Sequence, residues 1–148
     1  MAASPPPEGP GHWVASIPAQ APTTPLATGQ LAWLGDAVWE LHQRLRHCRQ
    51  PARAADLHLA VVAEVQAEAQ AEALRRLDPL LSEAERRLVL RGRNQAGRGP
   101  RRGTPGAYGQ ATGFETMLGW LFLQDPRRLA ELLDHLEKTE PCPPSASP

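Results

Sequence analysis

The sequence has 148 residues, 41% of them hydrophobic, and its formal net charge is zero because sixteen basic and sixteen acidic residues balance. This length fits one domain with flexible ends and leaves no room for two full-sized domains. A neutral total argues against a protein that coats nucleic acid through overall positive charge. The two cysteines, Cys48 and Cys142, form neither a disulfide framework nor a zinc-type spacing, so we expect a reducing compartment, the cytoplasm. The apolar runs are too short to span a bilayer, and the proline-rich start does not resemble a signal peptide.

Both ends of the chain are rich in proline and poor in large apolar side chains. Residues 1–28 contain seven prolines and residues 139–148 contain four. Segments of this composition cannot bury enough apolar surface to offset the entropy of ordering them. We therefore expect two disordered ends, 1–28 and 139–148, around one folded unit at residues 29–138.

Apolar residues recur at helical spacing through the folded unit, with no alternating strand pattern of useful length. The pattern predicts an all-α domain of about five main helices, at residues 30–46, 56–77, 82–94, 108–123 and 126–138. Ser82 and Glu85 form a capping box at the start of the third helix. Asp125 followed by Pro126 is typical of a helix start and begins the last one.

The apolar spacing also predicts which sides of these helices are buried. We expect one inward stripe on the first helix, consisting of Leu34, Val38, Leu41 and Leu45. The second helix is rich in alanine, a strong helix former, and is expected to continue as one helix to Leu77. The last helix should face inward through Leu129, Leu132, Leu133 and Leu136.

Two acidic residues interrupt apolar helical segments. Asp36 directly follows Gly35, and Glu115 has small residues one turn away on both sides, Ala111 and Gly119. Small residues let another helix approach closely, which would leave the carboxyl group of Glu115 at a helix crossing. Burying a carboxylate is costly unless it is paired or bound to a cation. Two such acids on separate helices suit Mg²⁺, which favours one or two carboxylates together with waters and substrate phosphate. The alternative is that both acids face solvent or that Asp36 pairs with an arginine.

Other residues near these acids have simpler interpretations. Glu40 lies one turn after Asp36, and pairing with Arg44 explains it better than a role in the site. All four tryptophans, Trp13 included, could stack on bases, but three lie in predicted helical segments, and for these we favour packing in the core or in a dimer interface. They are Trp33, Trp39 and Trp120.

The neutral total hides one strongly basic segment. From Arg86 to Arg102 there are seven arginines and no acidic residue. The glycines of the predicted loop at residues 95–106 let the backbone follow a phosphate ribbon, and guanidinium groups bind phosphate oxygens in a forked geometry. The candidate RNA-binding residues are Arg91, Arg93, Asn94, Arg98, Arg101 and Arg102. The alternative is a disordered basic loop without a partner.

At these same places the sequence resembles the ribonuclease III family, and specifically its Mini-ribonuclease III subfamily. The motifs, in chain order, are LAWLGDAVWE at residues 31–40, LH at 57–58, RGRN at 91–94, and ATGFE at 111–115 followed by LGWL at 118–121. Each motif alone is weak, but their order and spacing are specific. The resemblance covers about residues 29–138, the whole expected folded unit.

The resemblance implies a homodimeric helical domain that cuts double-stranded RNA with Mg²⁺. It makes Asp36 and Glu115 the active-site acids that hold the ion, which would activate a water and stabilise charge on the leaving 3′-oxygen. It directs the arginine loop at the RNA. It further implies maturation of the large-subunit ribosomal RNA precursor, with the pre-ribosome or a ribosomal protein as an additional candidate partner.

The sequence departs from the larger ribonuclease III enzymes at several positions. Ala32 and Thr112 stand where those enzymes carry further acids, a simplification that the Mini subfamily shares, so the number of metal ions stays open. Leu59 and Ala60 stand where basic residues tend to follow the Leu-His pair, which leaves RNA contact from that helix open.

Two other functions remain to be tested against this one. The first is a catalytically silent ribonuclease III-like domain that binds structured RNA during ribosome assembly; the presence of both Asp36 and Glu115 argues against it. The second is a plain helical interaction module whose acids are ordinary surface groups.

Overall fold

The computed structural model describes residues 9–17, 21–97, 99 and 103–139. Its helices are α1 (Trp13–Ser16), α2 (Thr28–His47), α3 (Ala54–Val65), α4 (Ala67–Leu77), the 3₁₀ helix η1 (Asp78–Leu80), α5 (Glu83–Gln95), α6 (Ala107–Gln124) and α7 (Pro126–Thr139). The described residues contain no strand, so the predicted all-α fold is confirmed, with seven α-helices where about five were expected. Within the same residues, no helix is long and apolar enough to cross a membrane.

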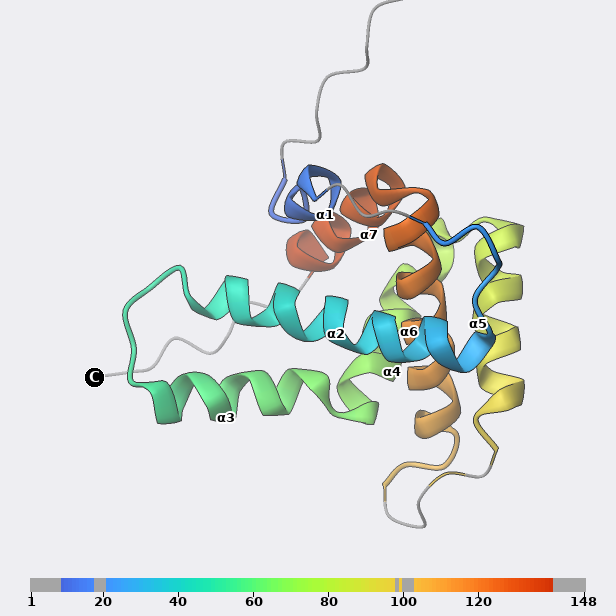
Figure 1. The fold of residues 1–148 in the computed structure, drawn as a ribbon. Coiled ribbons are helices and arrows are strands. Elements are labelled where there is room, and N and C mark those ends of the chain that lie inside the picture. Colours follow the sequence, from blue (N-terminus) through green and yellow to red (C-terminus); the bar gives the residue numbers. More distant parts are fainter. Residues whose placement is uncertain (1–8, 18–20, 98, 100–102, 140–148) are drawn as a thin grey trace, which may run out of the picture.

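Helix α6 lies at the centre of the fold. Helices α2, α4 and α5 pack along its sides, and Figure 1 shows α2 crossing it while α1 and α7 lie together at one end. The sequence of α6 explains this position, because its C-terminal half is apolar on nearly every side. Phe114, Met117 and Leu118 are fully buried, so Glu115 lies among core residues.

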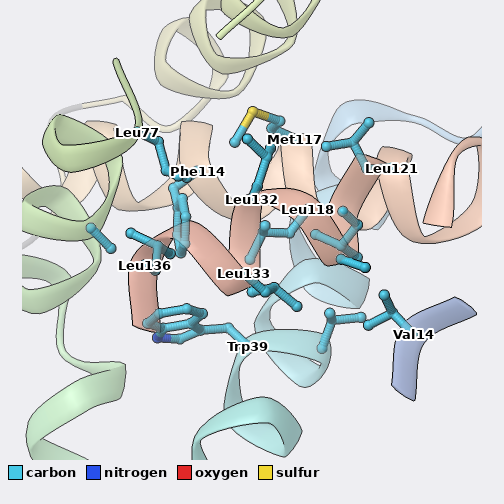
Figure 2. Close-up of a cluster of buried hydrophobic side chains, with 14 of the residues drawn as sticks. Val14, Trp39, Leu77, Phe114, Met117, Leu118, Leu121, Leu132, Leu133 and Leu136 are labelled. Atoms are coloured by element: carbon cyan, nitrogen blue, oxygen red, sulfur yellow. The ribbon is translucent and has the colours of Figure 1, made fainter. Parts of the chain in front are cut away.

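The core lies between α6, α7 and the middle of α2 (Figure 2). All four leucines predicted to face inward from the last helix are buried. Trp39 packs edge-on against Phe114, with the ring centroids 5.0 Å apart and the ring planes at 84°, an arrangement that aromatic pairs favour. This contact holds α2 on α6 close to both predicted acids.

Two predicted helix starts are confirmed by their caps. Ser82 Oγ accepts a hydrogen bond from the Glu85 backbone N–H at 3.2 Å, and the Glu85 carboxylate accepts one from the Ser82 N–H at 2.8 Å. Asp125 Oδ1 accepts one from the Arg128 N–H at 3.2 Å. Arg128 Nε also donates to Glu85 at 2.7 Å, which joins the starts of α5 and α7.

The prediction of one unbroken helix at residues 56–77 is wrong. Gln66 is extended (φ −68°, ψ 152°) and separates α3 from α4. The carbonyl groups at the end of α3 accept hydrogen bonds from side chains elsewhere: Trp39 Nε1 donates to Glu64 O at 2.9 Å, and Gln70 Nε2 donates to Val65 O at 3.2 Å. Because these donors satisfy the free end of the helix, tertiary structure overrides local helix propensity here.

The predicted inward stripe of the first helix is also wrong in its second half, while Leu34 in its first half is partly buried. Val38 is buried, but Leu41 and Leu45 are each 43% exposed. The residues that α2 buries are Leu31, Ala32, Gly35, Val38, Trp39, His42 and Gln43. Both stripes have helical spacing, so periodicity alone does not choose between them; the close packing at Gly35 decides which side meets α6.

The N-terminal segment takes part in the fold. Val14 of α1 is fully buried, Trp13 Nε1 donates to His42 Nδ1 at 3.0 Å, and the Gly11 N–H donates to Asp134 Oδ1 at 2.6 Å. The folded unit thus includes residues 9–17, ahead of the predicted start at residue 29. The remaining domain limits stay a prediction, because residues 1–8, 18–20 and 140–148 lie outside the described part of the chain.

Candidate active site

The site is built where two glycines let α2 and α6 cross. A Cβ atom added at Gly35 would overlap the Glu115 carbonyl, and one added at Gly119 would overlap the Leu31 carbonyl. A real side chain at either position would push the helices apart, so only glycine permits this distance. The close approach predicted at Gly119 is therefore present, and it carries Glu115 to the crossing.

The crossing brings the two predicted acids together. Asp36 is exposed and Glu115 is half-buried, and Asp36 is close enough to raise the pKa of the Glu115 carboxyl group. Both line one cavity of about 470 Å³. Its remaining lining is Thr28, Gly29, Ala32, Trp33, Gln95, Ala96, Tyr108 and Thr112, so hydroxyl and amide groups surround the acids.

The surroundings of the two acids favour binding of a cation or of a proton. Burial raises the pKa of Glu115 to about 7; a hydrogen bond from Gln70 acts against this rise, and Asp36 adds to it. Among the described residues, no basic side chain contributes to this shift. A carboxyl group in such surroundings takes up a proton near neutral pH unless a cation arrives to stabilise its charge.

This donor set fits a magnesium ion better than a transition metal. Within the described ranges, no group of three or more His, Cys, Asp or Glu side chains is placed to hold a metal ion. A structural zinc site needs four such ligands, whereas Mg²⁺ is bound through one or two carboxylates plus waters and substrate phosphate. The cavity beside Asp36 and Glu115 is large enough for those additional oxygen ligands.

The predicted RNA-binding residues divide between two sides of α5. Arg91 is exposed, and its Nη2 donates to Thr28 Oγ1 at 3.2 Å, next to the acid-lined cavity. Arg93 lines a different groove of about 790 Å³ between α4 and α5, and Asn94 is exposed between them. Three further candidates, Arg98, Arg101 and Arg102, lie outside the described residues.

The remaining sequence-based interpretations have separate outcomes. Glu40 accepts a hydrogen bond from Arg44 at 2.7 Å, so the predicted pairing is confirmed. Trp39 lies in the core, whereas Trp120 is 36% and Trp33 is 81% exposed. Core packing therefore accounts for one of the three tryptophans.

Sequence reasoning missed one buried polar residue beside the acids, Gln70. Its side chain is 1% exposed and is close enough to Glu115 to lower the pKa of that carboxyl group by hydrogen bonding. A signal was available: Gln70, Ala73 and Leu77 have the spacing of one helix face and are all buried. A glutamine on the inward face of a helix needs hydrogen-bond partners, and that requirement points to a polar neighbour.

Comparison with known proteins gives consistent matches. The Ribonuclease III domain family matches residues 29–126. The Mini-ribonuclease 3 of a Synechococcus species is 53% identical over 115 residues, which cover 78% of this chain and 83% of that protein. The Mini-ribonuclease 3 of a Synechocystis species is 46% identical over 133 residues, 88% of this chain and 93% of that protein. A crystal structure of a Fusobacterium nucleatum protein has a TM-score of 0.68 at 26% identity, covering 76% of this chain and 92% of that one.

Proposed function

Because the chain belongs to the ribonuclease III family, in its Mini-ribonuclease III subfamily, we propose that it uses Mg²⁺ held by Asp36 and Glu115. Membership establishes the reaction class: the chain is an endoribonuclease, a hydrolase that cuts double-stranded RNA. The metal, the roles of individual residues and the identity of the RNA belong to the proposal.

The observation that carries the proposal is the pairing of two carboxyl groups at the glycine crossing. Asp36 and Glu115 lie inside the family match, and their side chains line one cavity. No basic side chain of the described residues lowers the raised pKa of Glu115. The crossing fixes both backbones, so the distance between the acids does not depend on a flexible loop. Two carboxyl groups on fixed backbones, with no basic side chain among the groups that shift the pKa of Glu115, are arranged to receive a cation.

The chain's own residues would divide the work of hydrolysis. Asp36, which is exposed, and Glu115, which is half-buried, hold the cation from two helices. When bound, Mg²⁺ supplies an activated water and stabilises charge on the leaving 3′-oxygen. Thr28, Gln95 and Tyr108 line the same cavity and offer hydroxyl and amide groups to the sugar and phosphates beside the cut bond.

Duplex binding would rest on phosphate contacts from the arginine-rich segment. Arg91 lies beside the cavity through Thr28, and Arg93 and Asn94 continue the exposed end of α5. We propose that Arg98, Arg101 and Arg102 also bind phosphates of the duplex. The deep major groove of RNA hides its base edges, so recognition depends on shape, phosphates and 2′-hydroxyls, and binding should weaken steeply as salt rises.

We further propose that the enzyme acts as a homodimer. The indole of Trp33 is 81% exposed and lies at the acid-lined cavity, and tryptophan, which combines a large apolar ring with a polar N–H, is enriched at protein interfaces. A second copy covering Trp33 would set two cavities along one duplex, one for each strand. Sedimentation should show a dimer for the wild type and a weakened dimer for Trp33→Ser; a monomeric wild type would contradict it.

The biological substrate we propose is the large-subunit ribosomal RNA precursor, in the cytoplasm, with the pre-ribosome as a candidate partner. The deciding experiment is cleavage of a labelled RNA duplex with Mg²⁺ and with EDTA, followed by the precursor itself. Cutting that requires Mg²⁺ supports the proposal. Duplex binding without cutting would indicate a silent RNA-binding domain, and absence of binding at low salt would indicate a plain interaction module.

A further inference from the structure

Gln70 is a buried polar residue beside the acids that the proposed reaction leaves without a role. It lies on α4, which packs against α6, and its side chain is 1% exposed. It faces inward with Ala73 and Leu77 of the same helix. A buried amide in an otherwise apolar face costs free energy unless hydrogen bonds offset the loss of water, so its partners indicate its purpose.

The partners of Gln70 fix the orientation of its amide. Nε2 donates to Val65 O at 3.2 Å, and the side chain is also close enough to Glu115 to lower the pKa of that carboxyl group by hydrogen bonding. Both groups are acceptors when Glu115 is ionised, so both require the NH₂ end of the amide. Turning the amide around would set its oxygen against Val65 O.

The other end of the same amide shows what this orientation costs. Gln70 Oε1 is buried and has no hydrogen-bond donor among the described residues. Such a group in a native fold needs an explanation, and a functional site is one. The oxygen of the amide is left without a donor, and its NH₂ group points to the carbonyl at the end of α3 and toward Glu115.

We propose that Gln70 is a positioning residue that holds the Glu115 carboxylate in place for a divalent cation shared with Asp36. This inference rests on the cation site proposed above. The Val65 carbonyl anchors the amide to the helix break at Gln66, and the amide in turn restrains the carboxyl group, which otherwise rotates about its terminal bond. The break between α3 and α4 thus has a use: it frees the Val65 carbonyl to hold Gln70.

The neutral charge of Gln70 is essential to this role. A lysine or arginine at the same position would restrain Glu115 equally well but would also neutralise it and compete with the cation. A glutamate would add a like charge and raise the pKa of Glu115 further. An amide orients the carboxylate and leaves its negative charge available.

The test compares two buried glutamines, one beside the acids and one remote from them. Gln43 of α2 is also 1% exposed, and its Oε1 accepts a hydrogen bond from Arg46 Nη1 at 2.7 Å. Gln70→Met and Gln43→Met each replace a buried amide with an unbranched side chain of similar size. Gln70→Asn is a second variant, which keeps the amide but shortens its reach.

The main measurement is the melting temperature of the RNA-free protein against Mg²⁺ concentration, which reports cation affinity through ligand-linked stabilisation. Gln70→Met and Gln70→Asn should raise the half-saturating Mg²⁺ concentration about tenfold, the lower end of the effect of losing a group that orients a metal ligand. Gln43→Met should leave it unchanged. Binding of an RNA duplex in EDTA should be the same in all four proteins.

The outcomes separate failure of the inference from failure of the proposed function. If the wild type responds to Mg²⁺ and both Gln70 variants respond at the same concentrations, the positioning role is wrong and the cation site stands. If Gln43→Met loses affinity to the same extent, the effect is general destabilisation and the role is again wrong. If the wild type shows no response, the cation site itself is wrong, and the inference fails with it.

Discussion

Helix α2 carries two polar clusters, one around Asp36 and one around His42 six residues later, and they differ in how far their charges are compensated. Around His42 the one carboxylate is paired with two arginines. Trp13 Nε1 donates to His42 Nδ1 at 3.0 Å, and His42 Nε2 lies 3.6 Å from Glu137 Oε1. Glu137 in turn pairs with Arg46 at 2.9 Å and with Arg49 at 3.2 Å. Every charge has an opposite charge beside it, so this cluster fastens α2 and α1 to α7.

Around Asp36 the charges are left uncompensated. Glu115 interacts with a second acid and with a neutral amide, and burial raises its pKa to about 7. A polar cluster that only stabilises the fold contains opposite charges for each of its ions, because a buried charge without a partner is strongly destabilising. A half-buried carboxyl group that lacks opposite charges beside it is typical of a functional site that binds a ligand. The comparison therefore distinguishes function from structure on one helix.

The largest effect should come from neutralising the exposed acid of the uncompensated pair. Asp36→Asn should lower the rate of duplex cleavage by at least about a hundredfold, because it removes a proposed metal ligand, whereas loss of a group that only orients a ligand costs about 10–100-fold. Duplex binding in EDTA and dimer formation should persist. The measurement is single-turnover cleavage at saturating enzyme.

Glu40 provides the matched control for Asp36 on the same helix. Its carboxylate pairs with Arg44 on the exposed side of α2, and exposed pairs of this kind contribute little to stability. Glu40→Gln should therefore cut at close to the wild-type rate. A wild-type rate for Asp36→Asn, or an equal loss for Glu40→Gln, would remove the distinction between the two acids.

The next largest effect should come from separating the helices that hold the pair. Gly35→Ala places a Cβ atom on the Glu115 carbonyl, so α2 and α6 must move apart at a cost of about 1–3 kcal/mol, and cleavage should fall with it. Gly29→Ala is the control, since its Cβ would meet Gln95 Nε2 at 3.5 Å, an ordinary contact. Urea unfolding of both variants decides; equal stability would show that the crossing tolerates side chains.

Local chemistry in the sequence was sufficient to predict most of the helices. The capping box at Ser82 and the Asp125-Pro126 start are confirmed because caps act within four residues. The two acids came together as expected because a glycine beside each marks a close helix approach, and a close approach is visible in one sequence. Helix caps act within one helical turn, and each close-packing glycine lies within one turn of the acid that it places, so a single sequence is enough to predict both.

Most of the errors depend on tertiary contacts. The break at Gln66 depends on Trp39, which is distant in sequence, and on Gln70, which lies in the alanine-rich segment but is buried only because α4 packs against α6. The wrong stripe on α2 was chosen because Leu41 and Leu45 have the right spacing, although α6 lies against the other side. Packing of α1 depends on one buried valine and two hydrogen bonds, too little for composition to indicate.

A smaller effect should distinguish the two clusters by the direction of their pH dependence. Burial lowers the pKa of His42 from 6.5 to about 4, with Glu137 acting against the shift and the arginines adding to it. Between these values the unfolded chain binds more protons than the folded one, so stability falls as pH falls from 6.5 to about 4. The full loss is on the order of 2–3 kcal/mol.

His42→Gln should remove this loss, since an amide oxygen still accepts from Trp13 but does not titrate. Its free energy of unfolding by urea, measured at about pH 7 and about pH 4.5, should change less than that of the wild type. A wild-type slope that survives the substitution would show that the paired cluster is not what makes the protein sensitive to acid.

The smallest effect belongs to Glu115 and has the opposite sign. Its pKa is raised from 4.5 to about 7, so the folded chain binds more protons in this range, and stability falls as pH rises through it. Because Glu115 is only half-buried, solvent screening reduces the effect to roughly 1–2 kcal/mol. Glu115→Gln should thus be more stable than the wild type in EDTA near pH 8 and equal to it near pH 4.

The pH dependences of stability caused by His42 and by Glu115 have opposite signs and partly cancel in the wild type, so only His42→Gln and Glu115→Gln reveal them separately. If Glu115→Gln gave no gain at high pH, Glu115 would already be compensated, and the contrast between the two clusters would disappear.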